Sequence, residues 1–223
     1  MRFVIPILIG VVGVGILCWL GQWQLQRLAW KEGILADIDA RLVAPAQAIP
    51  ADPDPEADGF LTVRASGRIL EDEIHVLIST KTSGASYRII SPFEMAFGRR
   101  ILVDQGYIPT AAKDDVREGY DTTIVGNLHW PDERDRFTPE DDEVGNIWFA
   151  RDVQKMAAHL GTEPLLVILS ETGAPEPPVT PLPLSSAGIP NDHLGYAVTW
   201  FGLAIVWAGM TLLWLWRIRR RTD

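Results

Sequence analysis

Cysteine is almost absent from this chain, because Cys18 is the single one among 223 residues. A disulfide within one chain is therefore excluded. A copper site or a cysteine-bound zinc site is also hard to build, since soft metals need clustered thiolates or thioethers. Cys18 lies inside an apolar run, and we interpret it as a small packing residue.

The sequence also lacks the local patterns of common enzyme sites. It has no Gly-x-Ser-x-Gly, no His-Glu-x-x-His, no P-loop and no Gly-x-Gly-x-x-Gly context. His75, His129 and His159 are far apart without metal-ligand spacing, so we interpret them as ordinary surface or partly buried histidines. The acidic run 140–143 does not match a calcium-binding EF-hand loop and favours a solvated loop. We therefore expect no catalytic residues and a protein that is not an enzyme, and an unrelated membrane-anchored periplasmic enzyme stays as an alternative.

Basic residues are scarce in the middle of the chain. Residues 22–192 carry 15 Lys and Arg against 28 Asp and Glu, a net charge of −13, whereas the two ends carry 5 basic residues and one acid, a net of +4. Phosphate binding needs a basic face, so this middle argues against nucleic acid as a partner.

Two long apolar runs, 3–21 and 194–216, flank the acidic middle. At about 1.5 Å of rise per residue, each run is long enough to cross a hydrocarbon layer of roughly 30 Å, so both are predicted transmembrane helices in a lipid bilayer. A cleaved signal peptide is the alternative for 3–21. The run is longer than a usual signal core and no Ala-x-Ala-type site follows it, which favours an uncleaved anchor. An interface belt follows, made of Trp19, Trp23, Trp30, Arg27 and Lys31.

The orientation is predicted from the basic residues of segment 217–223, which are Arg217, Arg219, Arg220 and Arg221. The positive-inside rule makes this segment a cytoplasmic tail, which places both termini inside and residues 22–190 in the periplasm. Nothing resembling a transit peptide precedes Arg2, so we expect a bacterial inner membrane.

The predicted fold is a membrane α+β protein, in which the two transmembrane helices flank an antiparallel β-rich periplasmic domain with one or two helices. The first helix should continue beyond the membrane and stop near Pro45, ahead of a loop at 45–59. Residues 151–160 should form a helix that stops at Gly161, and 174–190 a Pro-rich tether. Alternating β-branched and aromatic residues predict strands within 60–69, 73–80, 86–95, 99–108, 122–130 and 164–170, as a sheet or small barrel.

Small residues recur in both apolar runs, and small residues let membrane helices approach each other closely. The two helices could pack together or on a partner, and the sequence leaves both alternatives open. The residues concerned are Gly10, Gly13 and Gly15 in the first run and Gly202, Ala204, Ala208 and Gly209 in the second.

The start of the second run holds the one histidine with a functional interpretation. Asn191 is a candidate helix cap, and His193 stands at the mouth of the predicted membrane helix. His193, Trp200, Trp207 and Trp214 recur every seven residues and so fall close to one stripe, with Tyr196 near its upper part. A histidine above stacked indoles resembles one wall of a site for a large, flat, apolar ligand with a metal centre, such as a haem. The alternative is that the tryptophans are lipid anchors and His193 is a polar cap.

Several segments together resemble the Surfeit locus protein family of cytochrome c oxidase assembly factors. They are GQWQLQRLAWK, YRIISPF with ILVDQGYIP, VGNLHWPDERDRFTPEDDEVGNIWF and NDHLGYAVTWFGLA, and they cover the chain from about Gly21 to Ala204. The sequence departs from the family pattern at Gln105, Tyr107 and Asp192, where arginine, tryptophan and asparagine are more usual.

The resemblance implies a role in maturing the oxidase catalytic subunit, at the stage where haem a is delivered or inserted. His193 is then the axial ligand of the haem iron, Trp200 a packing neighbour, and Arg27 a contact for a haem propionate. Trp23, Gln24, Arg27, Asn191 and Tyr196 match the structural signature of the family. The implied partners are the oxidase catalytic subunit and haem A synthase. The alternative is a scaffold that stabilises a subunit intermediate without touching haem.

Overall fold

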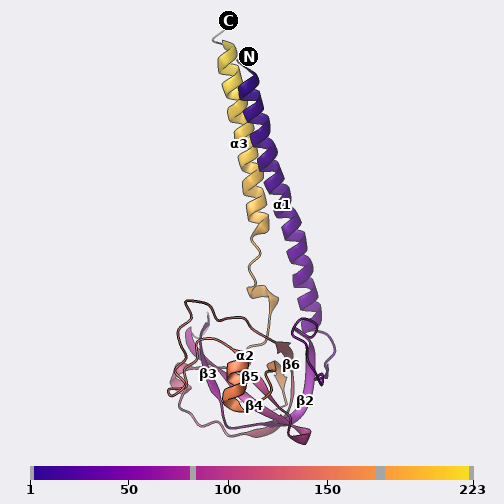
Figure 1. Ribbon diagram of the computed structural model, residues 1–223, viewed down its shortest axis with the longest axis vertical. Helices are drawn as coiled ribbons and strands as arrows, with labels where there is room; N and C mark the ends of the chain where they lie inside the picture. The colour runs from indigo at the N-terminus through magenta and orange to yellow at the C-terminus, as the bar shows by residue number, and fades with distance from the viewer. Residues whose placement is uncertain (1–2, 81–83, 174–178, 221–223) are drawn as a thin grey trace. The chain divides into compact units, whose positions relative to one another are not determined.

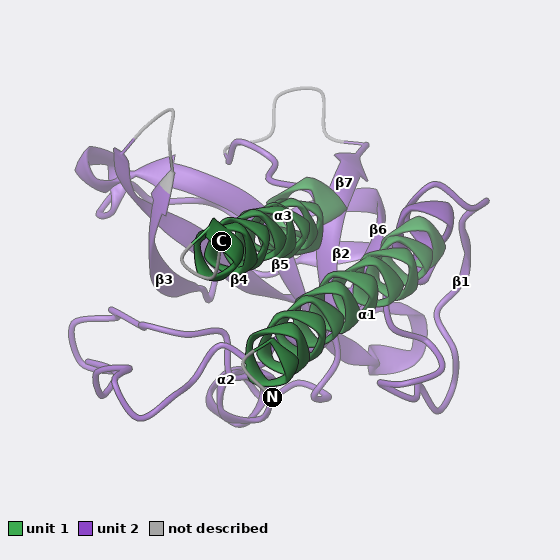
Figure 2. Ribbon diagram, turned by 90° about the horizontal axis from the view of Figure 1, so that it is seen from above, with its two compact units in different colours: residues 1–37, 186–223 green, residues 38–185 purple. Residues whose placement is uncertain are grey.

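The computed structural model describes residues 3–80, 84–173 and 179–220. The chain divides into two compact units, one formed by residues 1–37 with 186–223 and the other by residues 38–185 (Figure 2). Each unit has its own architecture.

The first unit is a pair of long helices, α3 (His193–Arg220) and the part of α1 (Val4–Leu42) up to residue 37 (Figure 1). The short 3₁₀ helix η3 (Ser186–Gly188) precedes α3. Both long helices have the length and apolar composition needed to cross a membrane. The predicted run 3–21 lies in the first half of α1, and 194–216 lies within α3. The expected continuation of the first helix is confirmed, since α1 runs on to Leu42 and ends before Pro45.

Glycines allow α1 and α3 to pack against each other in antiparallel directions. A Cβ added to Gly10 would lie 2.3 Å from Cγ2 of Thr211, and one added to Gly13 would lie 2.2 Å from Nε1 of Trp207. The two helices therefore approach so closely that no side chain fits at these positions. Gly15, Gly202 and Gly209 have no atom within 4 Å of an added Cβ, so the small residues do not all serve this contact.

The second unit is built on a seven-stranded sheet. The strand order is β1-β2-β6-β7-β5-β4-β3, and β2 also pairs with β4, which closes β2, β6, β7, β5 and β4 into a barrel. Every predicted strand is present. The bounds are β1 (Gln47–Ala48), β2 (Thr62–Ile69), β3 (Ile74–Thr80), β4 (Gly84–Met95), β5 (Arg100–Pro109), β6 (Tyr120–His129) and β7 (Leu166–Thr172).

The predicted antiparallel pairing of the strands is wrong at two places. β1 pairs parallel with β2, inside the predicted loop 45–59, and β5 pairs parallel with β7. A parallel pair needs a crossover connection of about a dozen residues or more. The chain between β5 and β7 supplies it, because it contains β6, a long loop and α2 before β7 enters between β5 and β6.

The predicted helix at 151–160 is α2 (Val153–Leu160). Asp152 is its N-cap, and the Asp152 side chain accepts a hydrogen bond from the backbone N–H of Lys155. Gly161 ends the helix in the left-handed conformation, as the sequence predicted. Two short 3₁₀ helices, η1 (Ala96–Gly98) and η2 (Thr110–Ala112), follow β4 and β5.

Strand β5 shows how two hydrophobic clusters form on opposite faces of one sheet. Ile101 and Val103 belong to a cluster with Phe93 and Leu128, whereas Leu102 belongs to one with α2 and Trp148. Successive side chains of a strand point to opposite faces. β5 is therefore apolar on both faces, because one face lies in the first cluster and the other lies under α2.

The described part of the predicted tether is bound to the barrel. Thr180 and Tyr107 exchange backbone hydrogen bonds of 2.8 and 3.0 Å, and Nη2 of Arg88 donates to the carbonyl oxygen of Leu182 at 2.8 Å. The added Cβ of Gly106 would lie 2.0 Å from the carbonyl oxygen of Thr180, so only glycine allows this close approach. Residues 174–178 of the tether lie outside the described part of the chain.

Candidate functional site

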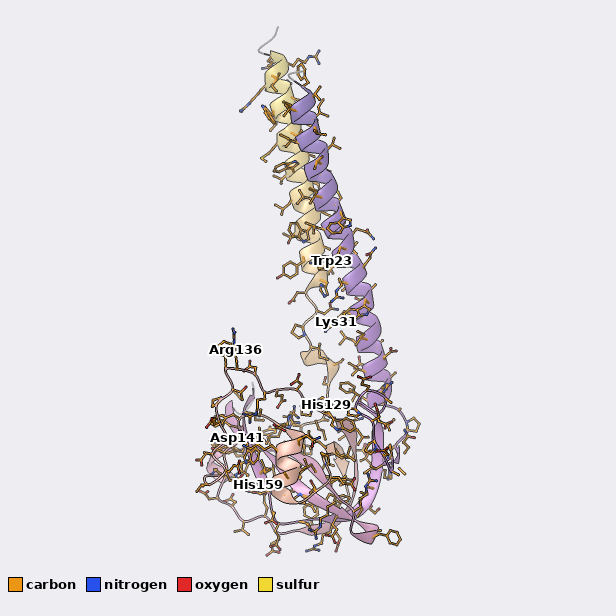
Figure 3. All side chains as sticks on the ribbon, viewed as in Figure 1. Trp23, Lys31, His129, Arg136, Asp141 and His159 are labelled. Atoms are coloured by element: carbon orange, nitrogen blue, oxygen red, sulfur yellow. The ribbon has the colours of Figure 1, made fainter. Side chains whose placement is uncertain are left out.

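The candidate site lies where the start of α3 meets α1. Nδ1 of His193 lies 2.8 Å from Oε1 of Gln24, and Gln24 is only 9% exposed. Gln24 follows Trp23, which Figure 3 marks on α1. The structure therefore joins two signature segments that are 169 residues apart in the sequence.

This hydrogen bond favours one tautomer of the imidazole ring. An amide oxygen can only accept, so Nδ1 of His193 carries the hydrogen and donates it to Gln24. In the neutral ring, Nε2 then keeps its lone pair. No residue in the described part of the chain bonds to Nε2 of His193, so this nitrogen can accept a proton, a hydrogen bond or a metal ion.

The predicted capping role of Asn191 is wrong. α3 begins at His193, which makes Asp192 the residue at the N-cap position, and the carbonyl oxygen of Asp192 accepts from the N–H of Tyr196 at 3.2 Å. Oδ1 of Asn191 is buried and has no hydrogen-bond partner among the described residues. The helix starts one residue later than a cap at Asn191 requires.

The tryptophan stripe of α3 does not form one uniform wall. Trp200 is half-buried, while Trp207 packs against Gly13 and donates from Nε1 to the carbonyl oxygen of Ile9 at 3.4 Å. Trp214 is 47% exposed. At least one indole of the stripe is therefore committed to packing between the two helices.

The remaining predicted site residues lie on the surface of the helix pair. Tyr196 and Trp23 are exposed, and Arg27 is exposed with its guanidinium 4.3 Å from the centre of the Trp30 ring. Arg27 therefore makes a cation–π contact on its own helix. The structure brings His193 together with Gln24, and it does not show a contact between His193 and Arg27.

The barrel domain, residues 38–185, contains a buried ionic cluster that the sequence did not lead us to predict. Asp104 of β5 is fully buried, pairs with Nε of Arg88, and lies 3.4 Å from Nη1 of Arg151. Arg151 also pairs with Glu133. Burial would raise the pKa of Glu133, but the hydrogen bonds and charge of Arg151 outweigh burial and lower it. The sequence signal for this cluster is the pair Asp104 and Arg88, two charged residues inside otherwise apolar strand segments.

His129 and His75 of the barrel domain both lie close to charged side chains. Burial and the positive charge of Arg151 lower the pKa of His129 to about 4. Nε2 of His75 lies 2.6 Å from Oε1 of Glu73, and Arg117 pairs with the same carboxylate. Burial would raise the pKa of Glu73, but the hydrogen bonds from His75 and Arg117 outweigh it and the pKa is lowered. Glu73 thus binds both His75 and Arg117, and we assign these contacts to structure.

The domain surface has a pocket of about 250 Å³ beside the ionic cluster. Four of its charged side chains are paired, Arg151 with Glu133 and Arg134 with Asp152 at 4.0 Å. Within residues 3–80, 84–173 and 179–220, no three His, Cys, Asp or Glu side chains come together as a metal-ligand set. His193 is thus the best candidate for ligand chemistry, as a single nitrogen donor.

Comparison with known proteins places these features in a family. A model of the SURF1 family matches residues 11–205. The chain is 28% identical to Surfeit locus protein 1 of Homo sapiens over 209 residues, which covers 82% of this chain and 68% of that protein. It is also 28% identical to the SURF1-like protein of Caenorhabditis elegans over 214 residues, covering 82% and 65% of the two chains. The chain spans about two thirds of the length of these relatives. The family match over residues 11–205 includes both His193 and Gln24. The chain belongs to the SURF1 family.

Proposed function

We propose that this protein is an assembly factor for cytochrome c oxidase that holds haem a through Nε2 of His193. The hydrogen bond from Nδ1 of His193 to Gln24 is the observation that carries this proposal, because it leaves Nε2 as a free nitrogen donor. Membership of the SURF1 family supports the assembly role, since the resemblance implies it.

The residues at the start of α3 have side chains that can ligate and pack against a haem. A neutral imidazole nitrogen is a common axial ligand of haem iron, and a hydrogen bond at its other nitrogen fixes the ring. Trp200 lies seven residues along α3 and offers an apolar indole as a packing neighbour. When bound, the haem is the cargo that the oxidase catalytic subunit needs. Arg27 would have to leave Trp30 to reach a propionate, so we place it second to His193.

The location that suits this role is a bacterial inner membrane. The two apolar helices serve as spans, and Arg217, Arg219 and Arg220 at the end of α3 mark the cytoplasmic side. His193 then lies at the outer face and the barrel domain in the periplasm, where it docks on the nascent catalytic subunit. Haem A synthase is the natural donor of the cargo.

The test is the absorption spectrum of protein purified from cells that also make haem a. We expect a haem band in the wild type and its loss or displacement in His193→Ala. His159→Ala is the matched control, because His159 lies on α2 in the barrel domain (Figure 3) and should leave the band unchanged. A band of unaltered position and amount in His193→Ala would refute the ligand assignment.

A scaffold that holds a subunit intermediate without haem is the second candidate. The observation that favours it is the exposure of apolar side chains on domain loops, where Phe97 and Val144 are fully exposed and Phe137 is 75% exposed. Co-purification of the oxidase catalytic subunit with a haem-free protein, equal for wild type and His193→Ala, would support the scaffold.

A further inference from the structure

We propose that Gln24 is a positioning residue, which sets the tautomer and the orientation of His193. This inference rests on the proposed function for its meaning, because a fixed Nε2 lone pair matters only when a ligand binds there. Gln24 contacts no reacting atom itself. It acts through the hydrogen bond of 2.8 Å that its Oε1 accepts from Nδ1 of His193.

The two partners belong to different helices, and both are held by the packing of the helix pair. Gly21 lies nearly one turn before Gln24, and a Cβ added there would lie 2.8 Å from the ring of Phe201. Ala197 lies about one turn after His193 and is 1% exposed. The close approach of α1 and α3 at these positions fixes the backbone of both residues, so the hydrogen bond is preorganised before any ligand arrives.

The local sequence gives a reason to distinguish Gln24 from its neighbours. Gln22, Gln24 and Gln26 all lie on α1, but only Gln24 of the three is buried. A buried amide oxygen without a donor would lose hydrogen-bonding free energy, and His193 supplies that donor. Gln22 and Gln26 therefore serve as matched controls of the same residue type on the same helix.

The neutral charge of Gln24 has a consequence for the ligand. A carboxylate at this position would draw the Nδ1 proton more strongly and would make the imidazole a more electron-rich donor. An amide accepts the same hydrogen bond without adding charge. Gln24 therefore orients His193 while keeping it a moderate ligand, which suits a protein that must later release its haem.

The first measurement needs no haem. The protein is labelled with ¹⁵N-histidine, and the ring nitrogens of His193 are assigned by comparison with His193→Ala. We expect a protonated Nδ1 and an unprotonated Nε2 in the wild type. Gln24→Met keeps the side-chain length and removes the acceptor, so it should give a mixture of tautomers, while Gln26→Met should match the wild type. A protonated Nε2 in the wild type, or no effect of Gln24→Met, would overturn the inference.

The second measurement uses the haem-loaded protein. Gln24→Met should weaken haem binding by about ten- to hundredfold, the usual effect of removing a hydrogen bond behind a metal ligand. Gln24→Glu should lower the reduction potential of the haem, whereas Gln26→Met and Gln26→Glu should change neither quantity. If the wild type binds no haem, the proposed function fails while the tautomer result still stands. If the Gln24 and Gln26 variants bind haem with equal affinity and the bound haem has the same reduction potential in all of them, the positioning role fails and the proposed function survives.

Discussion

Replacing Gly10 by alanine places a methyl group where α1 packs on α3. The new Cβ would lie 2.3 Å from Cγ2 and 2.9 Å from Oγ1 of Thr211. Thr211 cannot easily move away, because its side chain is β-branched and its hydroxyl donates to the carbonyl oxygen of Trp207 at 2.9 Å. The variant must therefore separate the helices or force Thr211 out of its rotamer.

Two opposing contributions determine how much Gly10→Ala changes the stability of the helix pair. Overpacking a well-packed contact costs about 1–3 kcal/mol. Alanine is the better helix former and gains about 1 kcal/mol relative to glycine. The net loss of stability for Gly10→Ala is therefore about 0–2 kcal/mol. Thr211→Ala removes the two nearest atoms, so the double variant should recover most of the loss, with a coupling free energy of about 1–3 kcal/mol.

The assay is a titration with sodium dodecyl sulfate in mild detergent micelles, followed by tryptophan fluorescence. Seven of the nine tryptophans lie outside residues 38–185, so the signal reports mainly on the helix pair. Gly15→Ala is the control, because no atom lies within 4 Å of its added Cβ and only the gain in helix propensity remains. Equal midpoints for Gly10→Ala and Gly15→Ala, together with no recovery in the double variant, would refute the close packing of the helices.

Three further predictions concern the stability of the barrel domain. Each is checked by measuring the free energy of unfolding in urea, with circular dichroism as the signal. The pKa of His129 is about 4 when folded and 6.5 when unfolded, so the unfolded chain binds the proton first as the pH falls. About 2–3 kcal/mol of stability should be lost between pH 6.5 and 4, and His129→Gln should flatten this part of the profile. Phe97 is exposed with φ of 66°, so Phe97→Asn should stabilise the domain by about 0.5–1 kcal/mol, and destabilisation would contradict the backbone assignment. Asp152→Ala removes the cap of α2 and should cost about 1 kcal/mol, whereas Asp152→Asn should cost less.

The local structure of the domain could be predicted from the sequence, but the pairing of its strands could not. The alternation in Ile101, Leu102 and Val103 marks a strand, and Gly161 marks the end of a helix. Nothing in these patterns says that β7 lies between β5 and β6, because an apolar strand fits any position with two buried faces. Barrel closure depends on contacts between distant segments, which a local pattern does not record.

The candidate site was found only in part for the same reason. His193 stood out by its position at the start of an apolar run. Its partner Gln24 was noted as part of a signature, but the contact joins residues 169 apart and no local spacing predicts it. The capping role was assigned to Asn191 wrongly, because the first residue of a helix can be located from sequence only to within a residue or two. Asp104 has no local signal in the sequence that marks it as buried, since a charge in a strand usually faces solvent, whereas here it is buried and pairs with two arginines.

The position of β7 also determines when the domain can complete itself during synthesis. β5 and β6 each have an edge that hydrogen-bonds to β7, and these edges stay unpaired until residues 166–172 have been made. Unpaired strand edges are templates for association with other chains. A chain that stops before Leu166 therefore leaves the ring of strands open, although four of its five members are present. The last strand to be synthesised is the one that closes the barrel.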